Sequence, residues 1–235
     1  MKRERTRNFG VRLILMFIIL TPALANAQLD TLHFIPPWHH KNTYDESSKI
    51  LVVTTPSGTP VNVSVELGDG TVVATGTCTN TSDFTYNAGA SSGNCGTIGD
   101  AALNTVHNNE GLIVHADKPV WASLNCNYRA AYNSPGAKLG LGTEFRAIQA
   151  RHNTHFNTIN HQTASIFVMA SEDGTTVTFD DIKTGVTFAG TPTTAGTSDP
   201  ITITLDKGES YIISAHANVS AANRGSVAGT RITSV

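Results

Sequence analysis

The chain contains few charged residues and, beyond residue 27, neither a long apolar run nor a helical pattern. Asp, Glu, Lys and Arg make up 14% of its 235 residues. No apolar segment beyond residue 27 is long enough to span a membrane as a helix. No segment there has apolar residues at the i, i+3, i+4, i+7 spacing of an amphipathic helix. Thr, Ser, Asn, Gly and Val are abundant instead, and they favour strands and turns. The sequence therefore predicts an all-β fold.

The sequence also lacks a recognisable catalytic constellation. Cys126 is the only conceivable thiol nucleophile, and such a residue needs an activating base beside it. Alternation along residues 120–126 sets Cys126 on the same strand face as Ala122 and Leu124, which predicts a buried and inert side chain. Paired carboxylates for glycoside hydrolysis can converge from distant loops, so an extracellular glycan hydrolase stays as an alternative function. We otherwise expect no enzyme, no catalytic residue and no cofactor.

Cysteine is scarce, with only Cys78, Cys95 and Cys126 in the chain. In an exported protein, one pair of cysteines is expected to close. The segment from Cys78 to Cys95 is rich in Thr, Ser, Asn and Gly, and tying it off would stabilise the fold by roughly 3 kcal/mol. We predict the structural disulfide Cys78–Cys95, with Cys126 left as a free thiol.

Histidine and acidic residues are present, but their spacing predicts no metal site. His152, His155 and His161 form the densest group, and positions three apart on a strand face opposite sides. The side chains of the neighbours His39 and His40 diverge on an extended chain. Acidic residues in or beside turns are Asp69, Glu172, Asp173, Asp180 and Asp181. They do not form the dense set of six to eight oxygens that calcium needs.

The first 27 residues have the layout of a secretory signal peptide. Five basic residues precede or flank an apolar centre at residues 13–20, and Ala25, Asn26 and Ala27 form a small-residue cleavage site. Its removal leaves 11 basic and 17 acidic residues. An acidic surface repels phosphate backbones and anionic lipid, so we expect no nucleic-acid partner and no membrane insertion after cleavage. The sequence predicts a secreted or cell-surface protein.

A fifteen-residue stretch occurs twice. Residues 49–63 (KILVVTTPSGTPVNV) align without a gap with residues 165–179 (SIFVMASEDGTTVTF), and residues 110–116 align with 228–234. Each copy of the fifteen-residue stretch is typical of a strand, a glycine turn and a second strand. Strands are expected at residues 49–55, 61–67, 71–77, 83–86, 111–116, 120–125, 143–149, 165–170, 176–180, 201–206 and 210–215. Between two of them, residues 116–119 (ADKP) predict a turn.

These strands predict tandem four-stranded antiparallel units in an incomplete β-propeller-like array, with two β-sandwich domains as the alternative. The expected organisation is a signal peptide at residues 1–27, an N-terminal lead-in at 28–48, a first β repeat unit at 49–150 and a second, truncated unit at 151–235. In the lead-in, two prolines hold Phe34 and Trp38 at a defined separation. This segment forms either a recognition surface or an anchor of the N-terminus on the first sheet.

Five motifs in this order resemble the amino-terminal domain of the IgGFc-binding protein family, including its bacterial secreted and surface relatives. They are residues 34–37 (FIPP), 109–122 (NEGLIVHADKPVWA), 141–146 (LGTEFR), 170–178 (ASEDGTTVT) and 205–211 (LDKGESY). The resemblance covers most of residues 32–235. It implies a non-enzymatic extracellular recognition or adhesion module for a protein or glycan ligand, within a longer surface protein. It assigns no ligand-binding residue, and a structural cell-envelope spacer is a further alternative.

Overall fold

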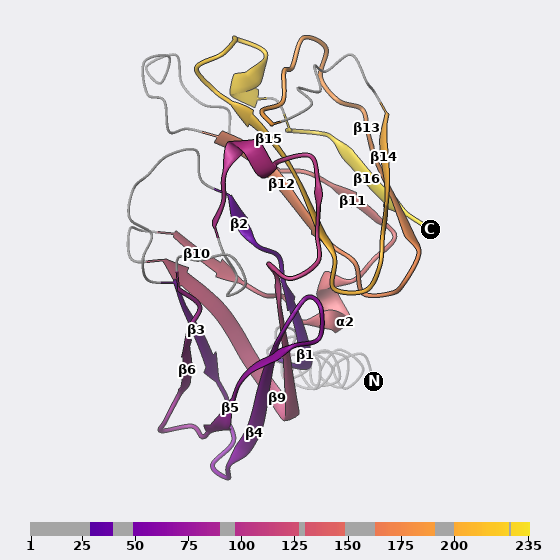
Figure 1. Cartoon of the computed structure of the whole chain (residues 1–235). Coiled ribbons are helices and arrows are strands. Elements are labelled where there is room, and N and C mark those ends of the chain that lie inside the picture. Colours follow the sequence, from indigo (N-terminus) through magenta and orange to yellow (C-terminus); the bar gives the residue numbers. More distant parts are fainter. Residues whose placement is uncertain are drawn as a thin grey trace, which may run out of the picture.

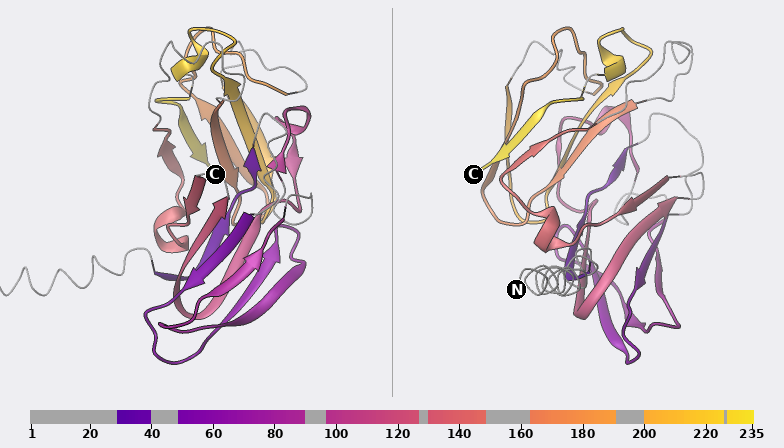
Figure 2. Two further views of the ribbon diagram at one scale, coloured as in Figure 1. Left: turned by 90° about the vertical axis from the view of Figure 1, so that its left-hand side faces the viewer. Right: turned by 180° about the vertical axis from the view of Figure 1, so that it is seen from behind.

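The computed structural model describes residues 29–39, 49–89, 97–126, 130–148, 163–190, 200–225 and 227–235. These residues form two bodies of β-sheet stacked end to end (Figures 1 and 2). All strand pairs but one are antiparallel; the exception is the short pair of β2 (Trp38–His39) with β7 (Thr97–Ile98). The predicted all-β fold with antiparallel sheets is therefore confirmed.

The first body, at the bottom of Figure 1, is a seven-stranded sheet that nearly closes on itself. Its strands are β1 (Asp30–Ile35), β3 (Lys49–Thr54), β4 (Val61–Leu67), β5 (Val72–Cys78), β6 (Phe84–Asn87), β9 (Leu112–Cys126) and β10 (Ala130–Asn133). The long strand β9 joins its two halves. The beginning of β9 pairs with β1 and β4, and the end of β9 pairs with β3 and β10.

The predicted strands in this body are close to the observed ones, although β1 and β10 were not predicted. The other difference is the turn expected at residues 116–119. This turn prediction is wrong, because β9 runs through it without interruption. Asp117 instead accepts hydrogen bonds from the backbone and side-chain nitrogens of Asn62, at 3.0 and 2.6 Å. Lys118 donates to Thr59 Oγ1 at 2.8 Å. The polar residues of the expected turn thus fix the start of β4 against β9.

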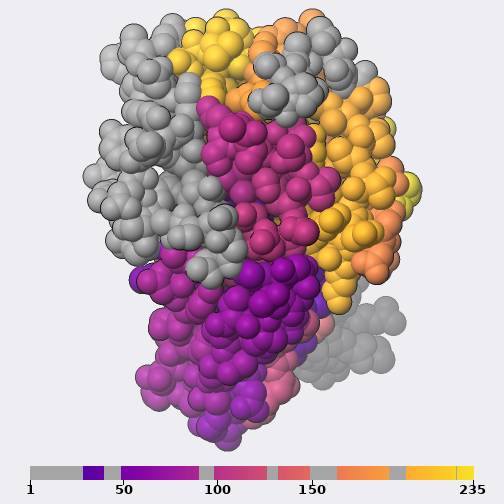
Figure 3. Space-filling view, in the orientation of Figure 1, coloured from indigo at the N-terminus to yellow at the C-terminus, as the bar shows by residue number. Residues whose placement is uncertain are grey.

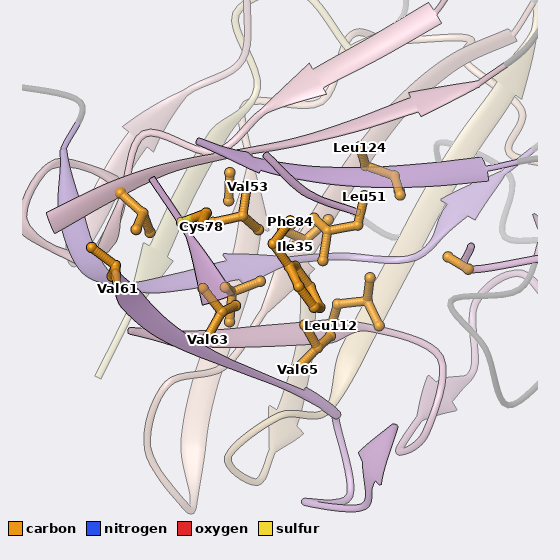
Figure 4. Packing of buried hydrophobic residues seen from close by; sticks show 14 of the residues in the cluster. Ile35, Leu51, Val53, Val61, Val63, Val65, Cys78, Phe84, Leu112 and Leu124 are labelled. Carbon is orange, nitrogen blue, oxygen red and sulfur yellow. The ribbon is translucent and has the colours of Figure 1, made fainter. Parts of the chain in front are cut away.

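The core of the first body lies between the two halves of its sheet (Figure 4). Alternate residues of each strand point inward, as in β4, where Val61, Val63 and Val65 are buried while Asn62 is exposed. Leu51 of β3 and Leu124 of β9 meet them from the other half. Strands β3 and β4 follow one another in sequence but do not pair, because β9 lies between them in the sheet order β5-β4-β9-β3-β6. The sandwich alternative is compatible with this order.

The second body has two sheets around a core of its own. One sheet has the order β11-β16-β13-β14 and the other the order β12-β15-β8. Their strands are β8 (Val106–His107), β11 (Glu144–Arg146), β12 (Thr163–Met169), β13 (Thr175–Asp180), β14 (Ile201–Leu205), β15 (Ser210–His216) and β16 (Arg231–Ser234). Phe179, Phe188 and Ile213 are almost completely buried between the sheets.

Residues from the earlier part of the chain pack onto this second body. Besides β8, they include β7 and the 3-10 helix η1 (Asp100–Ala102). Ile98 and Leu103 form a small cluster with Ile212 of β15, and Asn104 N–H donates to the Ile212 carbonyl at 3.2 Å. Figure 3 shows this segment, in magenta, on the surface against the later strands. The short helices α2 (Ala137–Gly140) and η3 (Asn223–Gly225) complete the elements of the described residues.

Cys78 is buried and has a free thiol in this structure. Burial raises the pKa of this thiol, and the carboxylates of Asp83 and Asp117 raise it further. Cys95 lies outside the described residues, as does the side chain of Cys126, so the Cys78–Cys95 bond stays a prediction. The signal peptide at residues 1–27 also lies outside them. Within the described ranges, no helix has the length and apolar character needed to cross a membrane.

Candidate functional site

A cavity with a volume of about 860 Å³ lies mainly beside the second body. Strands β12, β13, β16 and the segment around α2 contribute to its walls. Its aromatic lining residues are Phe34, Trp38, Tyr132, Phe145 and Phe167. Burial raises the pKa of the Tyr132 phenol, as expected for a hydroxyl in an apolar setting. An apolar cavity with few polar groups is the usual form of a binding site.

One wall of this cavity is the edge of a β-sheet. All nine residues from 163 to 171 line it. β12 is an end strand of its sheet, and among the described residues its only strand partner is β15. The Ala170 N–H donates to the Glu209 carbonyl at 2.9 Å. Because backbone groups alternate along an antiparallel strand, those of Ser165, Phe167 and Met169 point away from β15.

The N-terminal segment contributes to both the fold and the cavity. β1 pairs with β9, and Ile35 is completely buried in the core of the first body, so this segment anchors the N-terminus. Phe34 and Trp38 line the cavity. The anchoring role expected from the sequence is therefore observed, and the recognition role of Phe34 and Trp38 stays a prediction.

The segment around α2 is fixed to β1 by Asp30. Asp30 Oδ2 accepts a hydrogen bond from the Lys138 N–H at 2.7 Å, and Oδ1 accepts one from the Thr31 N–H at 2.7 Å. Burial alone would raise the pKa of Asp30, but these two hydrogen bonds, with the Lys138 and His33 charges, hold it below its usual value. This ionised carboxylate therefore holds one rim of the cavity in place.

A second candidate site consists of His39, Asp100 and His216. Sequence reasoning considered His39 only with its neighbour His40, which lies outside the described residues. The fold brings together residues 61 and 116 positions apart: Asp100 Oδ1 is 3.1 Å from His39 Nε2 and 3.1 Å from His216 Nε2. The two imidazole rings are stacked, with 6.5 Å between centroids and 8° between planes. His39 also lines the cavity.

Hydrogen bonds and pairing of the backbone fix these three residues. His39 lies opposite Ile98 in the β2–β7 pair, so Asp100 follows two residues later at the start of η1. His216 is the last residue of β15, and its carbonyl accepts a hydrogen bond from Asn223 Nδ2 at 3.1 Å. No sequence spacing could have indicated this cluster, because its members lie on three separate elements.

The acidic residues considered for calcium do not converge. Asp69 accepts from the Thr71 N–H at 2.9 Å, and Asp173 accepts from the Lys207 N–H at 2.9 Å. Asp180 forms an ion pair with Arg231 at 3.1 Å. Asp181 forms an ion pair with Arg146. These carboxylates stabilise turns and strand ends. His152, His155 and His161 lie outside the described residues.

The sequence does contain one short pattern that is also found in serine hydrolases. Residues 89–93 (GASSG) match the letters G-x-S-x-G, in which serine is the nucleophile of some hydrolases. That motif requires a strand, a sharp turn and a helix. Strand β6 precedes it, but residues 90–96 lie outside the described residues and the next described element is the strand β7. The match therefore carries no support from its structural context.

The described residues thus form an all-β fold with a largely apolar cavity. Residues 130–235 match the model of the family described as IgGFc binding protein. This match confirms the resemblance that the motifs indicated, over the part of the chain that contains β10 to β16. No curated protein and no solved structure matches the chain. The family is one of binding proteins, which supports a non-enzymatic binding module.

Proposed function

We propose that this chain is a secreted or cell-surface recognition module that binds a protein ligand by pairing an extended segment of it with β12. The observation that carries the proposal is the sheet edge in the cavity: residues 163–171 all line it, and β12 has an unpaired side there among the described residues. Extended peptides bind to such edges through backbone hydrogen bonds, while side-chain pockets give specificity.

The strand neighbours of β3 in the first body support the proposed pairing of a ligand strand with β12. β3 has two neighbours, β6 on one side and the end of β9 on the other. β12 is expected from the internal repeat to correspond to β3, and it has β15 on one side and the cavity on the other. The proposed duplication, with units at residues 49–150 and 151–235, thus predicts a strand at the open side of β12.

The side chains around the edge indicate what that strand should contain. In β9, Val120, Ala122 and Leu124 point into the core and are buried, while Trp121 is 40% exposed. The cavity beside β12 is bounded by apolar side chains such as Val177 and Ile232. We expect a ligand with small or branched apolar residues at alternate positions. The described lining residues include no Asp or Glu, so these residues offer no carboxylate pair for glycoside hydrolysis.

A peptide can test this mode of binding. The probe is a labelled synthetic peptide with the sequence of residues 119–126 and a serine in place of Cys126, titrated by fluorescence anisotropy. We expect saturable binding to the purified chain. A peptide with Ala122→Asp and Leu124→Asp should not bind, because both charges would be buried.

Two variants of the chain separate backbone pairing from side-chain contact. Ser165→Pro removes a backbone N–H that faces the cavity, and Ser165→Ala retains it. Both variants lose the 2.8 Å contact between the Ser165 and Ser214 hydroxyls, so Ser165→Ala is the matched control. One lost hydrogen bond of about 1.4 kcal/mol corresponds to roughly tenfold weaker binding in Ser165→Pro. Equal binding by both variants would overturn the proposed pairing.

The class of ligand needs a broader screen. The chain and both variants are applied to arrays of extracellular proteins, including IgG Fc because of the family description, and to arrays of glycans. Protein binding that Ser165→Pro loses and Ser165→Ala keeps supports the proposal. Glycan binding that Ser165→Pro keeps would contradict it. If a longer form of the protein did not bind the peptide because its own chain paired with the open side of β12, this result would also contradict the proposal.

A further inference from the structure

We propose that His39, Asp100 and His216 form a binding site for a divalent transition metal, for which zinc is the best match. Within the described residues, this is the group of histidine, cysteine and carboxylate side chains whose ligand atoms converge, all within 4.8 Å of one another. The inference goes beyond ligand recognition at β12 and does not depend on it.

The distances suit an ion with short bonds. Zinc bonds to imidazole nitrogen and carboxylate oxygen are about 2.0–2.1 Å long, so in tetrahedral geometry neighbouring ligand atoms lie about 3.3 Å apart. The distances from Asp100 Oδ1 to the two Nε2 atoms are both 3.1 Å. These two distances are close to the tetrahedral spacing, whereas the ligand atoms of the whole cluster lie within 4.8 Å of one another. The two imidazole nitrogens would therefore have to approach one another for an ion to bind all three atoms. The alternative is a structural pair of hydrogen bonds from two imidazoles to one carboxylate.

Burial and donor type define which ions fit. The His39 side chain is 0% exposed and that of His216 is 8% exposed, whereas that of Asp100 is 37% exposed. The scaffold thus fixes two nitrogen ligands and leaves access from solvent on the carboxylate side, where water can be a fourth ligand. Two imidazoles and one carboxylate suit zinc and related transition metals. Calcium and magnesium prefer sites built from oxygen alone.

A metal here would crosslink distant parts of the chain. His39 belongs to β2 and Asp100 to η1, whereas His216 ends β15 in the second body. Binding of a metal to a folded site adds its binding free energy to folding. The proposed site therefore predicts a higher Tm with zinc, together with tighter attachment of β2 and η1 to β15.

The test measures metal content and coordination directly. The purified chain is treated with a chelator, dialysed, and titrated with zinc chloride by calorimetry, and bound metal is counted by mass spectrometry. We expect one zinc ion per chain and a higher Tm. Cobalt(II) in the same site should give the strong visible absorption of tetrahedral coordination.

Variants distinguish the site from adventitious binding. Asp100→Asn and His216→Gln keep the size of the side chain and can still form hydrogen bonds, yet each should weaken zinc binding by about 100-fold or more, because each loses a direct ligand. His115→Gln is the control: His115 lies 3.4 Å from Glu66 in a more exposed pair, and its loss should leave zinc affinity unchanged. Circular dichroism confirms that each variant folds.

Two outcomes would overturn the site. One is a correctly folded chain that retains no zinc after dialysis, which would identify the three residues as a hydrogen-bonded group only. The other is equal zinc affinity and equal cobalt spectra in Asp100→Asn, His216→Gln and the unaltered chain.

Discussion

The two bodies contact one another through a pair of glycines, and this contact yields a quantitative prediction. Gly68 lies in the turn between β4 and β5, and Gly208 lies in the turn between β14 and β15. A Cβ atom on either residue would overlap the backbone of the other. Gly208 also has φ of +83°, a conformation that costs about 1–2 kcal/mol for other residues.

Three alanine variants separate strain from overlap. Gly70→Ala should cost about 1–2 kcal/mol from strain alone, because Gly70 has φ of +84° and open space around it. Gly68→Ala should cost about 1–3 kcal/mol from displaced backbone alone. Gly208→Ala combines both effects and should cost about 2–5 kcal/mol.

The measurement is the free energy of unfolding from equilibrium urea titrations of the three variants and the unaltered chain. The expected order of destabilisation has Gly208→Ala above both other variants. If Gly208→Ala and Gly70→Ala lost the same stability and Gly68→Ala lost none, the contact between the bodies would be refuted. The cavity walls that come from both bodies would then lack a fixed relative position.

Three further results are expected. Phe179→Ala should lower the free energy of unfolding by about 3–5 kcal/mol, because Phe179 is 0% exposed; the exposed Thr202→Ala on β14 should change it by less than about 0.5 kcal/mol. Burial lowers the pKa of His33 from 6.5, and hydrogen bonds to the Val120 and Asp30 carbonyls only partly offset this. Below pH 6.5 the unfolded chain therefore binds more protons at His33 than the folded chain, so the free energy of unfolding should fall as the pH drops towards the folded pKa. This fall should be smaller in His33→Gln, and identical pH profiles of the variant and the unaltered chain would contradict the prediction. Denaturing alkylation without reductant should modify only Cys126, and an intact mass with three modified thiols would reject the Cys78–Cys95 bond.

Much of the strand pattern could be predicted because the buried strands alternate regularly. In β4, every second residue is a buried valine or leucine, so both bounds were predicted from sequence. The two-residue strands β2, β7 and β8 are too short for any periodicity. The turn at residues 116–119 was mispredicted because Asp117 and Lys118 form tertiary hydrogen bonds with β4 instead of local ones.

The candidate sites were harder to predict because they depend on contacts distant in sequence. The pattern around Phe34 and Trp38 indicated either a recognition surface or an N-terminal anchor, but the cavity also requires β12 and β16. Histidines that lie near one another in sequence can be recognised as a group from the sequence alone. His39 instead meets Asp100 and His216 through the β2–β7 pairing and the packing of Ile98 on β15. Only the fold could bring these residues together.

The two proposed sites share a strand, and this allows a prediction about their coupling. Trp38 and His39 are the two residues of β2; both line the cavity, and His39 is also a proposed metal ligand. A metal that holds β2 in place removes part of the ordering cost of a ligand that contacts Trp38. Zinc should therefore tighten binding of the peptide of residues 119–126, and the peptide should raise zinc affinity by the same factor, because coupling between two ligands is reciprocal. Calorimetric titrations of each ligand in the presence and absence of the other measure both factors. In Asp100→Asn, zinc should no longer tighten peptide binding, while the affinity for the peptide without zinc should stay unchanged. Unequal coupling factors for the two ligands, or an undiminished zinc effect in this variant, would show that β2 does not link the sites.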